Sequence, residues 1–201
     1  MAEKDKAGFF DKMPPVAMLE AELARSRYRS RYKKVLRSTV FTLITVAAVA
    51  VLVATLWMPV YQVSGTSMTP TLTEDDIVIC RKSKKFDPGE VVAFYFNNKV
   101  LVKRVIASAG DIVDIDENGN VYVNGNKLDE PYVDELAFGE CDIDLPYMVP
   151  ESRYFVIGDH RAVSIDSRNK SVGCITAEDI VGKIIFCVWP RADFGKVEFQ
   201  G

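Results

Sequence analysis

A serine among small residues and a lysine on an apolar strand are the side chains best suited to covalent chemistry. Ser67 lies in SGTSMTPTL, residues 64–72. Lys103 lies in VLVKRVIA, where the alternation of a strand puts it on one face with Leu101 and Val105. A lysine among apolar neighbours loses its proton more readily than a free lysine and can then accept the proton of a serine hydroxyl. The two segments predict a serine nucleophile with a lysine general base.

Lys103 and His160 each allow a second interpretation. An edge strand often carries a lysine that blocks pairing with other chains, which would make Lys103 purely structural. His160 is the one histidine of the chain, so a Ser-His-Asp triad would have to use it. Two S-x-x-K patterns, at Ser30 and Ser167, lack the companion motifs of penicillin-binding enzymes and are interpreted as accidental.

Neither a metal nor an organic cofactor is predicted. One histidine cannot anchor a typical zinc cluster, and no G-x-G-x-x-G or P-loop pattern occurs. The four cysteines show no C-x-x-C spacing, and they could be disulfide-bonded or buried free thiols, with no pairing assigned: Cys80, Cys141, Cys174 and Cys187.

The segment TVFTLITVAAVAVLVATLWM, residues 39–58, contains no charged residue. As a helix it would span about 30 Å, the hydrocarbon thickness of a bilayer. A buried core helix is seldom apolar on every face over this length. A cleavable signal peptide has a shorter apolar run and a shorter preceding arm. We therefore expect one transmembrane helix.

Charge divides the chain on either side of this segment. Residues 1–38 hold ten Lys and Arg against five Asp and Glu, whereas residues 39–201 hold fifteen against twenty-three. Seven basic residues lie just before the span, which predicts a cytoplasmic arm at 1–38 and an extracytoplasmic domain at 59–201. Residues 16–36 have a helix-forming composition, and residues 1–15 have the composition of a disordered segment. The basic stretch could also suit a nucleic acid, but its position beside the membrane explains it without that ligand, and none is predicted.

The segment after the span is predicted to be mainly β. Its apolar stretches are short, rich in Val, Ile, Phe and Tyr, and separated by turn signals such as Asn124-Gly125. Strands do not alternate with helices in this sequence, as they would in a parallel sheet. We therefore expect antiparallel sheets. The predicted strands are DIVICRK, EVVAFYF, KVLVKRVIA, DIVDID, NVYVNG, RYFVIG and IVGKIIFCVW.

Three motifs resemble those of a known family. SGTSMTPTL, VKRVIASAGD and GDHRAVSIDSR occur in the order, and near the spacing, of the conserved boxes of bacterial type I signal peptidases. FDPGEVVAF and VPESRYFVIGD are similar to flanking segments of that family, and the resemblance covers roughly residues 38–190. It implies a catalytic domain of coiled antiparallel β-sheets, of the signal-peptidase/LexA-like kind, attached to one N-terminal transmembrane helix.

The resemblance also implies roles for individual residues. Ser67 matches the nucleophile and Lys103 the general base, while Ser164 matches a hydroxyl that orients the lysine. The supporting positions are Asp166 and Arg168, as an ion pair, and Asp159 and Arg161, as scaffold residues. The neighbourhood of the substrate and the oxyanion comprises Gly65, Thr66, Met68 and Pro70.

Of the departures from the family pattern, two bear on the mechanism. Gly65 stands where some members carry a serine that helps bind the oxyanion, so backbone N–H groups, including that of Ser67, must carry more of this stabilisation. His160 stands where the family more often has asparagine, which cannot act as a base.

The implied activity is a membrane-bound serine endopeptidase that removes signal peptides from exported preproteins through an acyl-enzyme. Its partners would be these signal peptides and the lipid bilayer, with the secretion machinery as a further candidate. Two rival hypotheses are a membrane-anchored β module that only binds a partner, and a self-cleaving Ser-Lys regulatory protease of related fold. The latter needs a soluble DNA-binding domain where this chain has the apolar segment.

Overall fold

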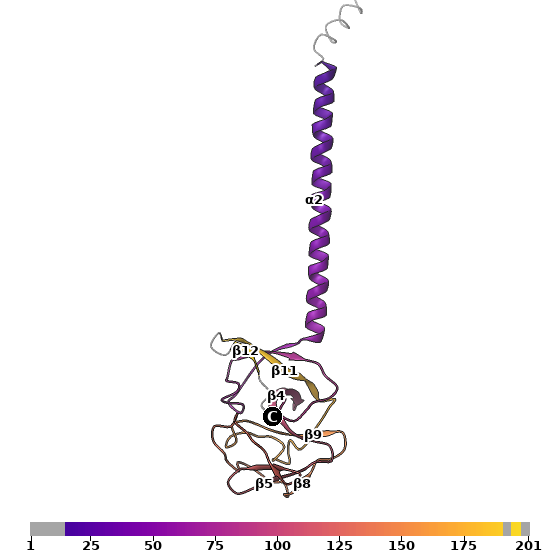
Figure 1. Ribbon diagram of the computed structural model, residues 1–201. Coiled ribbons are helices and arrows are strands. Elements are labelled where there is room, and N and C mark those ends of the chain that lie inside the picture. The colour runs from indigo at the N-terminus through magenta and orange to yellow at the C-terminus, as the bar shows by residue number, and fades with distance from the viewer. Residues whose placement is uncertain (1–14, 191–193, 198–201) are drawn as a thin grey trace, which may run out of the picture. The chain divides into compact units, whose positions relative to one another are not determined.

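In the computed structural model, residues 15–190 and 194–197 are described, and they form one long helix and a β-rich domain (Figure 1). The chain divides into two compact units, Met1–Val53 and Ala54–Gly201. The predicted disorder of residues 1–15 falls almost wholly outside the described residues. The architecture is the mainly β fold with one apolar N-terminal helix that the sequence predicts.

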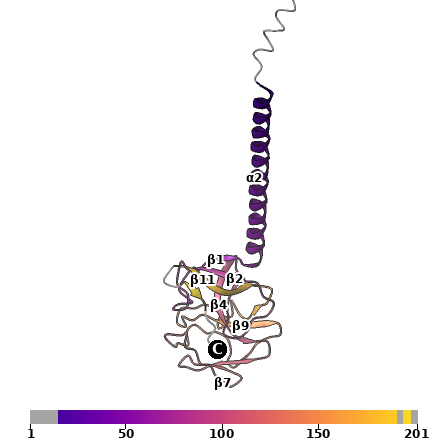
Figure 2. The same ribbon diagram turned by 45° about the horizontal axis from the view of Figure 1, so that its top comes forward.

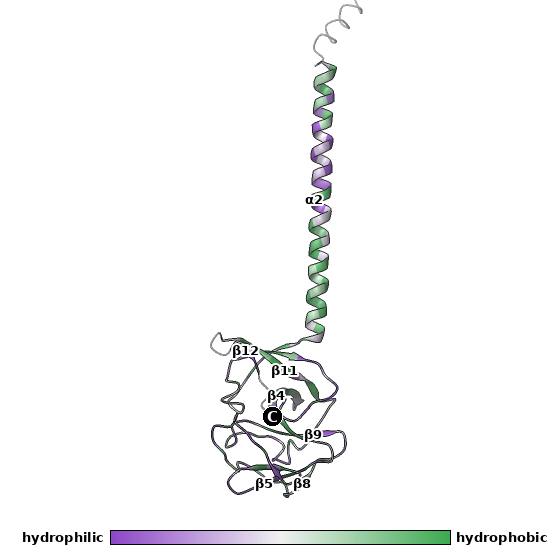
Figure 3. Cartoon of the chain, viewed as in Figure 1, coloured by the Kyte–Doolittle hydropathy of each residue, from purple (hydrophilic) through white to green (hydrophobic). Residues whose placement is uncertain are grey.

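Helix α2 runs from Val16 to Trp57 without a break. Its first half is rich in arginine and lysine and its last half is mostly apolar, which Figure 3 shows as a change from purple to green along the helix. Pro59 follows closely and disfavours further helix, because the residue before a proline avoids helical angles. None of its residues is buried, which is unlike the core helix of a soluble protein, and its apolar part is long enough to cross a membrane.

The larger sheet has eight strands, and every neighbouring pair in it is antiparallel. Figure 2 shows β1 and β2 beside β11 in this sheet. The order along the sheet is β1 (Val60–Gln62), β2 (Ile77–Arg81), β11 (Ile180–Trp189), β3 (Val91–Phe96), β4 (Lys99–Ser108), β9 (Arg153–Ile157) and β10 (Ile175–Thr176), with β12 (Gly195–Lys196) paired to β11.

The smaller sheet has four antiparallel strands. Their order is β7 (Asn126–Lys127), β6 (Val121–Val123), β5 (Ile112–Ile115) and β8 (Tyr147–Met148). All seven stretches predicted as strands form strands, namely β2, β3, β4, β5, β6, β9 and β11. The strands that the sequence did not predict are β1, β7, β8, β10 and β12. Each is only two or three residues long, too short for an alternating pattern.

Strand β4 lies in the middle of the larger sheet, between β3 and β9. It contributes to three apolar clusters, with Val102 beside the first, Ile106 in the second and Val105 in the third. A register shift against β9 between Val105 and Ala107 lets successive residues of this strand face different clusters. The interpretation of Lys103 as an edge-strand lysine is therefore wrong.

The turn before β4 fixes where that strand begins. Phe96 pairs with Lys99, and the two residues between them, Asn97 and Asn98, have φ angles of 46° and 61°. Asparagine is among the few residues that adopt this left-handed conformation, and two of them in succession suit a two-residue hairpin turn. The register of β4 on β3, and hence the direction of Lys103, is set from this turn.

All four cysteines lie in the described part of the chain, and no disulfide joins any two of them. Cys80 on β2 and Cys187 on β11 belong to the same buried cluster. The sequence left open whether the cysteines form disulfides or stay as free thiols, and the structure has free thiols.

Candidate active site

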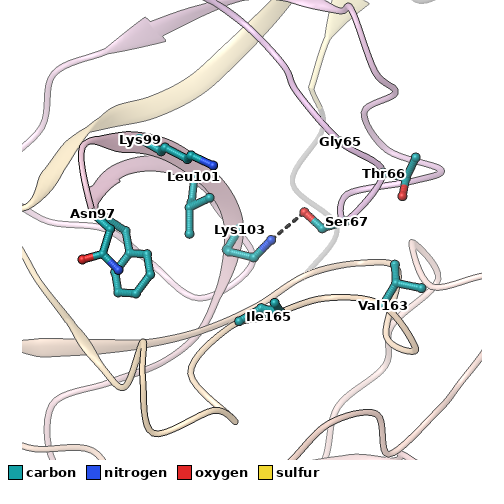
Figure 4. Close-up of a pocket in the computed structure, with 10 residues that line it drawn as sticks. Gly65, Thr66, Ser67, Asn97, Lys99, Leu101, Lys103, Val163 and Ile165 are labelled. Carbon is teal, nitrogen blue, oxygen red and sulfur yellow. Dashed lines mark hydrogen bonds between the residues drawn. The ribbon is translucent and has the colours of Figure 1, made fainter.

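Ser67 and Lys103 meet at one side of the larger sheet. The Nζ atom of Lys103 donates a hydrogen bond to Oγ of Ser67 over 2.5 Å (Figure 4). The lysine side chain is buried, and the serine is half-buried at the edge of a groove. The residues that the two sequence motifs contribute are thus within proton-transfer distance of each other.

Burial is the main reason why the pKa of the Lys103 amine is low. Lys103 is 3% exposed, and it shares its strand face with Leu101 and Val105, which belong to one apolar cluster. Loss of hydration disfavours the ammonium form and lowers the pKa of Lys103 to about 8, against the smaller opposite effect of the Asp166 carboxylate. A substantial fraction of the amine is therefore neutral near physiological pH and able to take a proton.

The segment that carries Ser67 is a tight turn anchored by buried side chains. Met68 and Leu72 are each 1% exposed, and the N–H of Leu72 donates to the carbonyl of Met68. Gly65 has a φ of +87°, a conformation that favours glycine. These features hold the Ser67 hydroxyl at the surface of the domain while its neighbours are fixed in the core.

His160 lies against the same turn through its backbone. Its N–H donates to the carbonyl of Ser67 over 3.1 Å, and its Nδ1 lies 3.3 Å from the carbonyl oxygen of Thr66. The contacts of the imidazole and of the backbone N–H are thus with main-chain carbonyls, whereas Lys103 contacts the Ser67 hydroxyl.

Gly158 packs between Ser164 and the turn that carries Ser67. Ser164 is 2% exposed, and its Oγ has no hydrogen-bond partner among the described residues. A Cβ atom at Gly158 would lie 2.2 Å from that Oγ and 2.5 Å from the carbonyl oxygen of Ser67. Position 158 therefore admits only glycine if Ser67 and Ser164 keep their places. The sequence analysis did not single out this residue.

Asp166 and Arg168 form a buried ion pair. The guanidinium donates from Nε to Oδ1 and from Nη2 to Oδ2, each over 2.9 Å. The same carboxylate accepts the N–H of Gly158 over 3.0 Å, and Arg168 also donates to the carbonyl of Ser164 over 3.3 Å. This ion pair therefore joins the backbone at Gly158 to the backbone at Ser164.

Asp159 and Arg161 have separate partners. Asp159 accepts two hydrogen bonds from Arg104, over 2.9 and 2.6 Å, and a third from Thr71 over 2.6 Å. Arg161 forms an ion pair with Glu130, on the connection between strands β7 and β8 of the smaller sheet. Arg104 follows Lys103 on the opposite strand face, so its bonds to Asp159 join the lysine's strand to the loop after β9.

Arg104, Thr71 and Glu130 belong to this site but were not predicted from the sequence. A charged residue in the middle of an apolar strand was the available signal for Arg104. Glu130 lies 31 residues from its partner in sequence and has no local pattern that marks it.

An open groove of about 450 Å³ begins at the two reactive side chains. Val163 and Ile165, both more than half exposed, line it together with Leu101. In Figure 4 Leu101 lies above the Lys103 side chain and Ile165 below it, whereas Val163 lies beyond Ser67, below Thr66. Among residues 15–190 and 194–197, no group of His, Cys, Asp or Glu is arranged to hold a metal ion. The mostly apolar lining of this groove suits a ligand with apolar side chains.

Comparison with known proteins supports a peptidase. Residues 36–189 match the family model of signal peptidase, peptidase S26. Signal peptidase IB of Staphylococcus aureus is 38% identical over 154 residues, which cover 67% of this chain and 79% of the relative. Signal peptidase I S of Bacillus subtilis is 36% identical over 148 residues, which cover 68% and 79%.

The protein is thus a serine endopeptidase. It belongs to the peptidase S26 family of signal peptidases. The hypothesis of a β module without chemistry does not agree with this membership. A crystal structure of a signal peptidase I from Enterococcus faecalis is similar with 27% identity and a TM-score of 0.43, over 49% of this chain and 96% of that one.

Proposed function

We propose that the protein is a membrane-bound signal peptidase in which Ser67 is the nucleophile and Lys103 the general base. The observation that carries the proposal is the hydrogen bond between the two side chains, 2.5 Å long, with a lysine that is buried. Membership of the signal peptidase family supports the removal of signal peptides by a serine protease. The polypeptide needs no metal or organic cofactor for this chemistry.

In the first half of the reaction the neutral amine of Lys103 takes the proton of Ser67 as the serine oxygen attacks the scissile carbonyl. The tetrahedral intermediate collapses to an acyl-enzyme, and Lys103 returns the proton to the departing amine. In the second half Lys103 takes a proton from water as the water oxygen attacks the ester, and Lys103 returns this proton to Oγ of Ser67 as the acyl bond breaks. The signal peptide leaves as a carboxylic acid, which ionises to a carboxylate.

The oxyanion of each intermediate requires hydrogen-bond donors. Gly65 offers no side chain, so we assign this role to backbone N–H groups that include the one of Ser67. The neighbouring residues Thr66, Met68 and Pro70 complete the turn that presents these groups, with Met68 buried as its anchor.

The supporting residues act by fixing the reactive pair. We assign to Ser164 the orientation of the lysine amine, because its buried hydroxyl still lacks a partner among the described residues. Asp166 and Arg168 fix the backbone at Gly158 and Ser164, and Asp159 fixes Arg104 next to Lys103. Arg161 attaches the same loop to the segment that carries Glu130.

The test is cleavage of a preprotein by the purified full-length protein. Ser67→Ala and Lys103→Ala should each abolish cleavage while the domain stays folded. The double variant should lose no more than either single one, because the two residues serve one proton transfer. Appreciable turnover by either folded single variant would contradict the mechanism.

We propose further that residues 39–58 span the membrane, that residues 1–38 are cytoplasmic, and that residues 59–201 are extracytoplasmic. The helix is long and apolar enough, and its seven basic residues before the span favour a cytoplasmic N-terminus. Ser67 follows the span by nine residues, so a substrate emerging from the same bilayer would reach it without travelling far.

Labelling in sealed cells tests this orientation. A membrane-impermeant reagent should reach cysteines introduced after Tyr61 but not those introduced before Lys33. The reverse pattern would put the active site in the cytoplasm, where signal peptides are not removed.

A further inference from the structure

A cluster of basic residues follows strand β2, on the same unit as the active site. The segment RKSKK, residues 81–85, contains four of the fifteen lysines and arginines that follow residue 38. All four of its basic side chains are exposed, and none forms an ion pair within the described part of the chain. We call residues 81–85 the basic loop. It is a concentrated positive charge on a domain whose net charge is strongly negative.

Backbone contacts put the basic loop at the end of the apolar helix. Strand β1 pairs with β2, and beyond this pairing the N–H of Cys80 donates to the carbonyl of Pro59 over 2.9 Å. The N–H of Lys82 donates to the carbonyl of Trp57 over 3.5 Å. If residues 39–58 cross the bilayer, the basic loop is therefore at the level of the lipid headgroups on the side of the active site.

Strand β11 also fixes the position of the basic loop. A Cβ atom at Gly182 of β11 would lie 2.7 Å from the carbonyl oxygen of Arg81, so the backbone of the loop passes directly over this glycine. Ser83 donates to the carbonyl of Lys85 over 2.7 Å, which shapes the rest of the loop. The lysines are thus displayed from a backbone that is held in place.

A cavity of about 350 Å³ opens beside the basic loop. Its lining includes Lys82 and Ser83 from the loop and the two tyrosines Tyr61 and Tyr95. Cationic and hydroxyl groups on one side and aromatic rings on another are the mixture that suits the boundary between headgroups and acyl chains.

We propose that the basic loop binds the anionic headgroups of phospholipids in the leaflet next to the active site. The inference rests on the proposed membrane-bound function. Charge complementarity supplies the attraction, and the direct attachment of the loop to the helix end brings it to the membrane surface.

The test uses the full-length chain in phosphatidylcholine vesicles that contain spin-labelled phosphatidylglycerol. Electron paramagnetic resonance measures how much labelled lipid is immobilised by the protein, relative to labelled phosphatidylcholine. Each basic residue near an anionic surface strengthens association by about fivefold, so Lys84→Gln with Lys85→Gln should weaken lipid binding at the basic loop by at least about tenfold. The fraction of labelled phosphatidylglycerol that the protein immobilises should fall accordingly, to the level that the remaining basic residues maintain. The arginine and lysine residues before the span are unchanged in this comparison.

The matched control is Lys127→Gln with Lys170→Gln, which removes the same charge from two other exposed positions. Its lipid association should equal that of the unaltered protein, and Lys84→Arg with Lys85→Arg should retain it too. If the Lys84/Lys85 and the Lys127/Lys170 glutamine variants bind labelled phosphatidylglycerol equally, whether strongly or weakly, the proposal is overturned. Stronger displacement of the label by inorganic phosphate than by chloride at equal ionic strength would also overturn it, because the site would then bind soluble anions.

Cleavage of a soluble signal-peptide substrate by all variants, in vesicles of phosphatidylcholine alone, separates this inference from the proposed function. These rates should be unchanged by either pair of glutamines. An unaltered protein that cleaves nothing would contradict the proposed function and leave the lipid measurement to be judged by itself.

Discussion

Gly158 and Ser164 lie so close together that a methyl group on the glycine would come within 2.2 Å of the serine Oγ. The same methyl group would come within 2.5 Å of the carbonyl oxygen of Ser67. The turn that carries Ser67 and the loop after β9 therefore meet at a residue without a side chain. Asp166 holds this meeting point by accepting the N–H of Gly158.

Replacing Gly158 by alanine should damage catalysis more than folding. The methyl group must displace Ser67, Ser164 or both, and a shift of about 1 Å at a reactive group can lower the rate by about a hundredfold. Preprotein cleavage by Gly158→Ala should therefore fall by about that factor in kcat, with the circular dichroism spectrum unchanged. Gly195→Ala is the control, since a Cβ there meets no atom of the described residues within 4 Å. A Gly158→Ala protein with normal kcat would show that the loop gives way without consequence.

The rate should rise with pH through the pKa of Lys103. Burial lowers this pKa to about 8, and only the neutral amine can take the Ser67 proton. Below that pKa the rate should fall by about tenfold for each pH unit, and above it the rate should level off. The measurement is kcat/KM for one preprotein between pH 6 and pH 10, with the folded fraction monitored at each point. A rate that is flat, or that falls as pH rises, would exclude a lysine base.

His160→Asn should leave cleavage within about tenfold of the unaltered rate, a loss of no more than about 1.4 kcal/mol. The reason is that the backbone N–H at this position, which asparagine retains, makes the bond to Ser67. Loss of a general base would instead lower the rate by about a hundredfold or more. Lys103→Ala on the same preprotein supplies that comparison. An inactive asparagine variant beside an active Lys103→Ala would mean that histidine is the base.

The sequence predicted those features that follow from local patterns. Alternation along residues 100–107 predicted the face on which Lys103 lies, and the apolar stretch predicted the long helix. It also predicted which of the longer stretches would be strands. What it could not predict depends on tertiary contacts: the ion pair of Arg161 with Glu130 joins residues far apart in sequence. The requirement for Gly158 likewise arises only when three segments pack together.

The ion pair of Arg104 with Asp159 is another tertiary contact that the sequence could not predict. Arg104 follows Lys103 in its motif, and Asp159 is itself an expected scaffold residue, yet neither motif says that the two segments are bonded to each other. A buried guanidinium needs a partner, so burial of Arg104 would have predicted an acidic one without identifying it.

The reduced thiols of the domain determine how its folding and stability depend on redox conditions. Burial raises the pKa of Cys80 to about 12 and that of Cys174 to about 11, so hardly any thiolate is present at these sites to react with oxidants. Strands β2 and β11 are joined by packing and hydrogen bonds, with no disulfide between Cys80 and Cys187. Maturation of the enzyme is therefore independent of thiol-oxidising catalysts, and reducing agents leave its architecture intact.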